Sequence, residues 1–370
     1  MTSVQHDSSK GGEKLTKKRK SPTIKDVAHA AGVSRATAAR ALGDYGYSSG
    51  AVRDAVMKAA ADLGYAPSRM AKAMRNGRSQ LIGYVSADIT DGLFSEALGG
   101  ICRIAEPAGY QVVVFNSTDS LDDEIDGITT LLSHGVEGLI VSPVIVSHCE
   151  HLAEAARSVP LVCLDRAPTG LPSVVSDNEG AGRQAALRLL RDGHRKIGLV
   201  VSVQAEEPIE LEIGDTETAV LGADRPSVLR VRGFVENMQE SGEIIDPLRI
   251  CLNPHRAVNT FELVSSWLDR NPEVTAVVAA DSYQARHLYL ALQKRGRVVP
   301  SEMSLLVFSD DEWTQFVSPA IDTIRLDGAE MGAKAARVLL GGISNRRGES
   351  VVETIPTIYR QGGSIAAIRD

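Results

Sequence analysis

The sequence lacks the features that would place it in a membrane or an oxidising compartment. No apolar run approaches the about 18 residues that cross a bilayer. Its 4 cysteines form no CxxC pair, which argues against a disulfide framework and against a zinc site. No apolar segment follows the basic run near the N-terminus, so we expect no secretory signal and a cytoplasmic location.

Motifs of common enzyme classes are also missing. The sequence contains no GxGxxG, no P-loop and no GxSxG elbow, and it offers no paired general acid and base. The residues His148, Cys149 and His151 faintly resemble a metal cluster, but they open an amphipathic pattern that favours a solvated helix start. We therefore predict that the chain is not an enzyme and has no catalytic residues, cofactor or metal.

Charge is unevenly distributed along the 370 residues, a length that corresponds to two or three domains. Residues 1–79 hold 15 Lys and Arg against 6 Asp and Glu, a net charge of +9. Residues 80–370 hold the other 25 against 41, a net charge of −16, so the whole chain carries −7. A basic segment neutralises phosphates and an acidic one is repelled by them, so the division favours DNA binding by the small basic part.

A helix-turn-helix is indicated over residues 22–66. Thr23 can cap a first helix, Gly32 suits the positive φ of a tight turn, and Ser34 can cap a second helix. A third helix begins at a Ser49 cap and closes a small apolar core with the first two. Residues 1–21, rich in Ser, Gly and Lys, are typical of a disordered basic tail.

The outer face of the second helix is expected to read DNA. In this geometry the helix enters the major groove, where Arg40 can fork onto guanine O6 and N7. The hydroxyl groups of Ser34 and Thr37 can reach phosphates. The DNA contacts predicted on the helical domain are Thr23, Ser34, Arg35, Ala36, Thr37, Ala39, Arg40, Tyr47 and Ser49.

A series of short motifs runs in fixed order from Thr23 to Val85. They are Asp26-Val27-Ala28, Ala31-Gly32-Val33-Ser34, Thr37, Arg40-Ala41-Leu42, Gly46-Tyr47 and Leu63-Gly64-Tyr65-x-Pro67. In order and spacing this run resembles the lactose/galactose repressor (LacI/GalR) family of bacterial transcription regulators. The resemblance implies a sequence-specific repressor in the nucleoid, whose operator affinity is controlled by a bound effector. A homodimer on a palindromic operator is expected, because one small head buries too little DNA to be specific.

The same resemblance implies that residues 67–79 form a hinge helix and linker. In that family the two hinge helices of a dimer enter the minor groove and wedge apart a base step. Met74 stands at the position of the usual Leu wedge, and an apolar, flexible side chain can still unstack bases. The alternative is a plain linker helix. The contacts predicted on this segment are Ser68, Ala71, Lys72 and Met74.

From residue 80 on, short β-rich runs alternate with helical patterns, which predicts parallel sheets covered on both faces. Strands are predicted at Leu81–Val85, Gln111–Phe115, Gly138–Val141, Leu161–Leu164, Lys196–Val201, Ala276–Ala280 and Ser304–Phe308. Helices are predicted at Leu93–Ala108, Leu121–His134, Asn178–Asp192, Leu229–Ser241, Phe261–Arg270 and Ser282–Arg295.

The family resemblance continues to about residue 365 and implies that residues 80–370 form an effector-binding and dimerisation domain. Its fold is expected to be α/β, with two Rossmann-like lobes of periplasmic-binding-protein type behind an all-α head. Crossings between the lobes are expected near Val175, near Arg325 and after Gly342. The first lobe then takes residues 80–175 and 326–342, and the second takes 176–325 and 343–370.

Polar and aromatic residues at predicted strand ends form the candidate effector site, because ligands of such sheets bind there. Carboxylates accept hydrogen bonds from hydroxyl groups, and an aromatic ring packs on the C–H face of a sugar, so a sugar or sugar derivative is predicted. The predicted effector contacts are Asp91, Phe94, Asp165, Arg166, Arg230, Asp281, Asp310 and Trp313.

Several of these assignments leave alternatives open. Trp313 and Phe94 can each belong to the hydrophobic core instead of the effector pocket. Arg225 is an alternative to Arg230 as the cation of the pocket. An arginine in the pocket would favour a carboxylated or phosphorylated effector. The other possibility is that it pairs with acidic residues of the segment between Val201 and Arg230. For the whole chain, the alternatives are a sugar-binding protein of periplasmic type without a DNA function, and a sugar-acting α/β enzyme.

Overall fold

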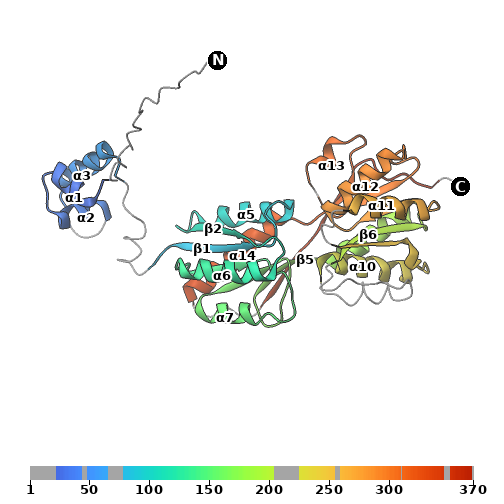
Figure 1. Cartoon of the computed structure of the whole chain (residues 1–370), viewed down its shortest axis with the longest axis horizontal. Helices are drawn as coiled ribbons and strands as arrows, with labels where there is room; N and C mark the ends of the chain where they lie inside the picture. The colour runs from blue at the N-terminus through green and yellow to red at the C-terminus, as the bar shows by residue number, and fades with distance from the viewer. Residues whose placement is uncertain are drawn as a thin grey trace, which may run out of the picture. The chain divides into compact units, whose positions relative to one another are not determined.

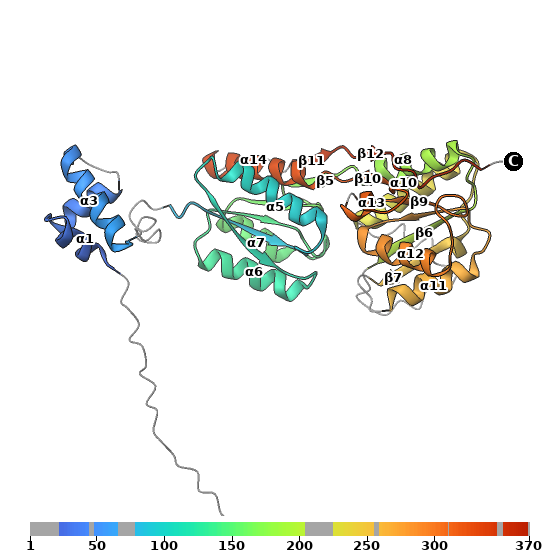
Figure 2. The same ribbon diagram turned by 90° about the horizontal axis from the view of Figure 1, so that it is seen from above.

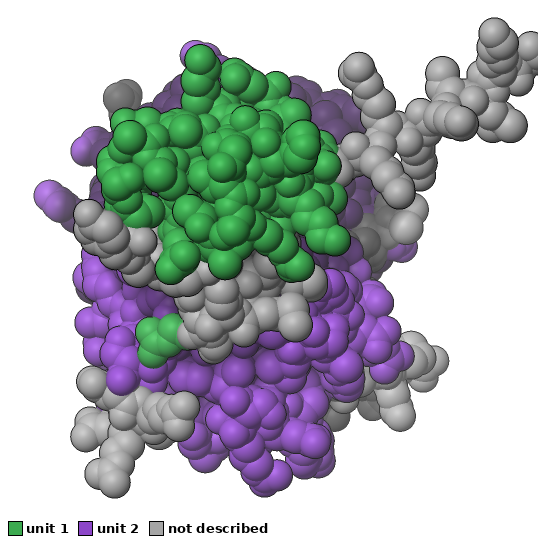
Figure 3. All heavy atoms as spheres, turned by 90° about the vertical axis from the view of Figure 1, so that its left-hand side faces the viewer, with its two compact units in different colours: residues 1–79 green, residues 80–370 purple. Residues whose placement is uncertain are grey.

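A computed structural model of the chain describes residues 22–43, 48–65, 78–203, 225–254, 259–309, 311–345 and 351–368. Contacts divide the chain into two units, residues 1–79 and residues 80–370, which Figure 3 colours separately. In these described ranges, no helix is both long and apolar enough to cross a membrane.

The first unit folds into α1 (Ile24–Ala30), α2 (Arg35–Gly43) and α3 (Gly50–Leu63), drawn in blue in Figure 1. The carboxylate of Asp26 accepts hydrogen bonds from both the backbone N and the Oγ1 of Thr23 at 2.7 Å, which closes the start of α1. Gly32 takes a φ of +66° in the turn to α2, a conformation that favours glycine. The helices bury a small core whose members include Val27, Ala38 and Val56.

The first lobe of the second unit is a fully parallel sheet with the strand order β11-β5-β4-β3-β1-β2. Its strands are β1 (Leu81–Ser86), β2 (Gln111–Asn116), β3 (Gly138–Val141), β4 (Leu161–Leu164), β5 (Ser173–Ser176) and β11 (Val352–Ile355). One face is covered by α5 (Gly92–Ala105) and α14 (Gly328–Asn345), and the other by α6 (Leu121–Ser133) and α7 (Glu150–Ser158), as Figure 2 shows.

The second lobe repeats this plan with the strand order β12-β10-β9-β8-β6-β7, in which β12 alone runs antiparallel to its neighbour. Its strands are β6 (Ile197–Val203), β7 (Ile250–Pro254), β8 (Ala276–Ala279), β9 (Ser304–Val307), β10 (Asp322–Arg325) and β12 (Ile358–Arg360). Its helices are α8 (Asn178–Arg191) and α10 (Pro226–Glu240) on one face, α11 (Thr260–Arg270) and α12 (Ser282–Lys294) on the other, and the short α13 (Trp313–Phe316) and η1 (Pro247–Arg249). The predicted fold class is thereby confirmed.

The chain passes between the lobes after β5, after β10 and after β11. The third crossing differs from the expectation, because β11 pairs in parallel with β5 of the first sheet and continues that lobe to Ile355. The sequence predicts instead that the chain after Gly342 belongs to the second lobe. A strand of four residues that leaves two of its side chains exposed carries little hydrophobic pattern, and only its pairing reveals the lobe to which it belongs.

Glycines let one helix pair in each lobe approach closely. A Cβ atom on Gly100 of α5 would lie 2.0 Å from the backbone O of Ala329. A Cβ atom on Gly182 of α8 would lie 1.9 Å from the backbone O of Arg230 in α10. Because no larger residue fits at these contacts, the two glycines set where α14 and α10 lie, and α10 carries cavity residues at its start.

Candidate functional site

The second helix of the first unit presents a basic outer face. Arg35, Ala36 and Arg40 are exposed, whereas Ala38 and Ala41 of the same helix are buried against α1 and α3. Cationic side chains on one exposed helix face match the electrostatic footprint of a DNA-reading helix.

The predicted hydroxyl contacts of this unit are engaged in helix starts. Ser34 Oγ accepts from the backbone N of Thr37 at 3.1 Å and lies 2.9 Å from its Oγ1. Thr23 donates its hydroxyl to Asp26, and Ser49 stands exposed at the start of α3. Ala39 is half-buried. Five other predicted contacts lie outside the described residues: Tyr47, Ser68, Ala71, Lys72 and Met74.

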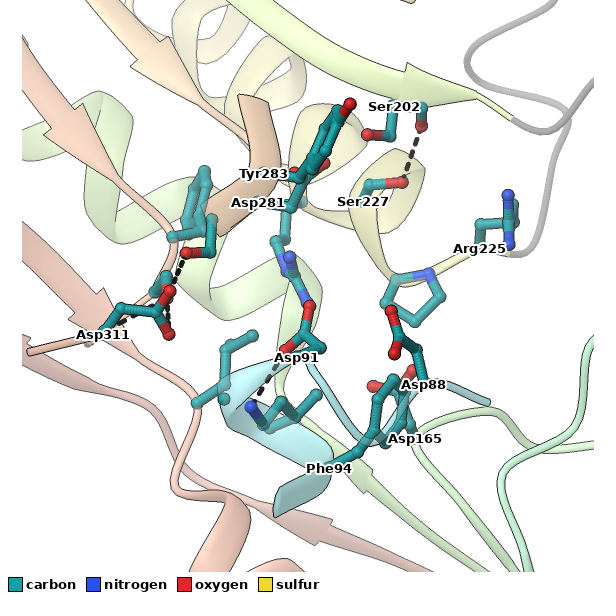
Figure 4. A pocket seen from close by; sticks show the side chains of 18 of the residues that line it. Asp88, Asp91, Phe94, Asp165, Ser202, Arg225, Ser227, Asp281, Tyr283 and Asp311 are labelled. Atoms are coloured by element: carbon teal, nitrogen blue, oxygen red, sulfur yellow. Dashed lines mark hydrogen bonds between the residues drawn. The ribbon is translucent and has the colours of Figure 1, made fainter. Parts of the chain in front are cut away.

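A polar cavity lies between the two lobes of the second unit, at the ends of strands from both sheets (Figure 4). From the first lobe it is lined by residues after β1, after β2 and after β4. From the second it is lined by Ser202 in β6, by residues after β8 and β9, by the end of β10 and by the start of α10. The charged residues among them are Asp88, Asp91, Glu96, Asp119, Asp165, Arg166, Arg225, Arg230, Asp281, Asp311 and Arg325.

Two aspartates of the cavity begin helices on opposite sides of it. Asp91 Oδ1 accepts from the backbone N of Leu93 at 2.9 Å and caps α5. Asp281 Oδ1 accepts from the backbone N of Gln284 at 2.9 Å and caps α12. Burial raises the pKa of Asp91 to about 6, and the nearby carboxylates of Asp281 and Asp311 add to this rise. These carboxylates make one end of the cavity strongly acidic.

Among the buried carboxylate oxygens at the cavity, Oδ2 of Asp281 and Oδ1 of Asp165 have no hydrogen-bond partner in the described part of the chain. Asp165 is 5% exposed and takes a φ of +73° at the turn after β4. Burial raises its pKa, and the positive charges of Arg166 and Arg230 oppose that rise. A buried hydrogen-bond acceptor without a donor costs free energy, so both oxygens are placed to accept hydrogen bonds from a ligand.

Arg230 is held rigidly beneath the cavity at 4% exposure. Its Nε donates to Asn178 Oδ1 at 2.9 Å and its Nη1 to the backbone O of Ala280 at 2.5 Å. Its guanidinium lies over the ring of Phe308, 5.8 Å from the ring centre. Burial lowers its pKa, while Asp165 and other carboxylates favour the charged form.

The structure brings together most of the predicted effector residues. Those that line the cavity are Asp91, Phe94, Asp165, Arg166, Arg230 and Asp281. Asp310 lies outside the described residues, whereas its neighbour Asp311 lines the cavity.

Trp313 requires a correction, because its side chain packs against the core beneath α11 and α12 rather than on the cavity. Its ring lies 5.7 Å from that of Tyr289. Trp313 begins the short helix α13, and that turn directs the large ring towards apolar neighbours. The aromatic residues that do line the cavity from this lobe are Tyr283 and Phe308.

The sequence prediction omits several cavity residues, of which the same strand-end rule points to Ser202 and Asp119. Ser202 lies near the end of β6, and Asp119 follows β2 in a left-handed conformation with a φ of +57°. Ser227 belongs to the first turn of α10, where its Oγ donates to the backbone O of Ser202 at 3.0 Å. Arg325 ends β10 and pairs with Glu96 at 3.5 Å. Because the sequence does not predict β10, the strand-end rule does not point to Arg325.

Two family models match the chain: residues 23–68 match bacterial regulatory proteins of the lacI family, and residues 186–365 match a periplasmic binding protein-like domain. The transcriptional regulator KdgR of Bacillus subtilis is 27% identical over 329 residues, covering 88% of this chain and 92% of the relative. The ribose operon repressor of Bacillus subtilis is 27% identical, covering 91% of this chain and 96% of the relative.

Solved structures agree over nearly the whole chain. A complex of the transcriptional regulator CelR with cellobiose is 25% identical with a TM-score of 0.66, covering 93% of this chain and 99% of the other. A lac repressor dimer bound to operator and the anti-inducer ONPF is 23% identical with a TM-score of 0.78, covering 94% of this chain and all (100%) of the other. The second likeness is evidence of the shared fold.

Proposed function

Since this chain belongs to the lacI family of DNA-binding transcriptional regulators, we propose that it represses transcription as a homodimer on a palindromic operator. A sugar or sugar derivative in the cavity between the lobes controls its operator affinity. The observation that carries this proposal is the pair of buried, unpartnered carboxylate oxygens on Asp165 and Asp281, one from each lobe. Hydroxyl groups of one ligand satisfy both and so bias the relative position of the lobes.

On the DNA side, the proposal rests on the exposed basic face of α2. Arg40 reads a guanine in the major groove, and Arg35 adds charge beside it. The net charge of +9 on residues 1–79 supports phosphate contacts, which make the affinity depend on salt. Met74 wedges a central base step of the operator from the hinge segment.

On the effector side, the relatives supply the chemical class. CelR is seen with cellobiose, and a LacI family regulator of Enterococcus faecium, 22% identical, is seen with ribose. The carboxylates of the present cavity are the acceptors that a polyhydroxylated ligand requires. We propose that this chain also binds a sugar, and we name no particular one. The protein then works in the cytoplasm beside the nucleoid, binds and releases its effector unchanged, and catalyses no reaction.

The test is DNA binding by the full-length protein. Duplexes enriched from random sequence should share a palindrome, and affinity for it should fall steeply with salt, as phosphate contacts demand. A panel of sugars should raise the melting temperature, and the same sugars should change operator affinity. Sedimentation should show a dimer on the operator.

A double variant, R35E/R40E, serves as the control, because it removes the basic face of α2 and leaves the cavity untouched. It should lose operator binding and keep the sugar-induced rise in melting temperature. Sugar binding by a protein that binds no duplex at any salt concentration would favour the periplasmic-type alternative. Turnover of a bound sugar would favour the enzyme.

A further inference from the structure

We infer that the effector carries an anionic group, a carboxylate or a phosphate, which Arg166 and Arg225 bind beside the start of α10. This inference rests on the proposed effector function and narrows its ligand class. Three observations carry it: an arginine without a hydrogen bond or ion pair among the described residues, a buried guanidinium nitrogen without an acceptor among them, and the gathering of three guanidinium groups at one end of the cavity.

Arg225 lines the cavity immediately before the first turn of α10. No hydrogen bond or ion pair joins its guanidinium to another residue in the part of the chain that the structure describes. Burial lowers the pKa of Arg225 to about 10 and the positive charge of Arg166 adds to this effect, while the carboxylates of Asp119, Asp165 and Asp281 oppose it. The Arg225 guanidinium therefore has negative charge around it but no acceptor in contact among the described residues.

The Arg166 guanidinium is held in place by hydrogen bonds to the protein, but one of its donors has no acceptor among the described residues. Its Nη1 donates to the backbone O of Val144 at 2.8 Å and also to that of Pro143, and Nη2 lies 3.6 Å from Asp119 Oδ1. Its Nε is buried and has no partner among the described residues. At 8% exposure the side chain is preorganised, because its position is set by the backbone rather than by a ligand.

Three guanidinium groups gather at this end of the cavity. Those of Arg166, Arg225 and Arg230 surround Asp165, and the carboxylates of Asp119 and Asp281 also act on Arg225. Among the described residues, none of these carboxylates forms an ion pair with Arg225. An uncompensated buried charge is costly, and a bound anion removes that cost.

The start of α10 strengthens the same site. The helix has 15 residues and a dipole whose positive end faces this site, and Pro226 has no N–H at the first position. The N–H groups of Ser227 and Val228 precede the first bond of the helical ladder, in which Leu229 N donates to Arg225 O. Figure 4 shows Arg225 on the opposite side of the cavity from Asp311. Asp91, Asp281 and Asp311 therefore accept hydroxyl groups at one end while the arginines hold the anion at the other, as a sugar acid or sugar phosphate requires.

The decisive measurement is calorimetric titration of the full-length protein with matched ligands. Pentoses and hexoses are each tested as the neutral sugar, the aldonate, the terminal phosphate and the amino sugar. We expect an anionic member to bind about tenfold or more tightly than its neutral parent. Whether the aldonate or the phosphate binds more tightly shows which anionic group the effector carries. Equal affinity of neutral and anionic members, or preference for the amino sugar, overturns the inference and leaves the proposed function standing; binding of no sugar of any kind overturns both.

Variants at Arg225 give a second, independent readout. Arg225→Gln should weaken the anionic ligand about tenfold or more, leave the neutral parent unchanged, and leave the ligand-free melting temperature unchanged or higher. Arg225→Lys should restore part of the anion preference because it keeps the charge. The matched control is Arg270→Gln, at an exposed arginine that does not line the cavity. A clear drop in ligand-free stability for Arg225→Gln would mean that a protein carboxylate, not a ligand, neutralises Arg225.

Discussion

Gly92 of the first lobe lies directly against Asp311 of the second. A Cβ atom on Gly92 would stand 2.4 Å from Asp311 Oδ1, closer than non-bonded atoms approach. Asp311 is itself held, since Ser282 donates its hydroxyl to Oδ2 and Ser309 Oγ lies 3.3 Å from Oδ1. The rim of the cavity is therefore a tight contact between the lobes at which only hydrogen fits on Gly92.

Gly92→Ala should separate the lobes or displace the Asp311 side chain from its hydroxyl partners. We expect effector affinity to fall by about fivefold or more, which corresponds to about 1 kcal/mol of overpacking. The ligand-free melting temperature should change little, because the methyl group acts at the rim and not in a core. Calorimetric titration measures the change, and Gly99→Ala is the control, since a Cβ there meets nothing within 4 Å. Unchanged affinity would show that Asp311 moves aside freely.

Gly182→Ala should destabilise the second lobe. Its Cβ would lie 1.9 Å from the backbone O of Arg230 and 2.7 Å from the backbone N of Phe234, and backbone atoms of a packed helix move only together. We expect denaturant unfolding to give a free energy of unfolding lower by about 1–3 kcal/mol. Gly341→Ala, at an exposed position of α14 where a Cβ atom meets nothing within 4 Å, should instead gain about 0.5–1 kcal/mol. Equal behaviour of both variants would refute the close approach of α8 and α10.

Asp91→Asn should stabilise the ligand-free protein at neutral pH. The pKa of Asp91 is about 6 in the fold against 3.8 ordinarily, so between these values the folded state binds more protons and the free energy of unfolding falls as pH rises. Asparagine keeps the cap on α5 without the charge. Urea unfolding should show a gain of the order of 1–3 kcal/mol above about pH 6 that vanishes below about pH 4. A gain that is the same at every pH would exclude the carboxylate's ionisation as its cause.

Arg40→Ala should relax operator specificity at one base pair. If Arg40 forks onto a guanine, its loss removes about 1–3 kcal/mol at that position and leaves discrimination elsewhere intact. Binding of operator variants, each changed at one position, measures this. The control is Lys58→Ala on the exposed side of α3, which removes the same charge away from α2. Equal losses on every sequence would make Arg40 a phosphate contact instead.

The extent of agreement between sequence and structure differs from element to element. The strands Gly138–Val141 and Leu161–Leu164 occur with the bounds that were predicted, because fully buried parallel strands are continuous apolar runs. β7 and β10 were missed, since β7 contains Asn253 and Pro254, and β10 opens with the buried Asp322. Asp322 is tolerated in a core because Tyr359 and Ser364 hydrogen-bond its carboxylate, partners that no local pattern reveals.

The amino-acid sequence was sufficient to predict the basic charge of the N-terminal unit, the helix-turn-helix and the alternation of strand and helix. Charge, helix caps and hydrophobic periodicity are local properties of neighbouring residues. The tertiary structure alone decided which carboxylates meet which arginines. Asp119 and Arg166 are 47 positions apart in the numbering and come from separate strand ends, yet they lie 3.6 Å apart. Trp313 packs against a core and Arg225 lines the cavity for the same reason. The surroundings of a side chain depend on how segments distant in the sequence pack together, and no single position in the sequence determines that packing.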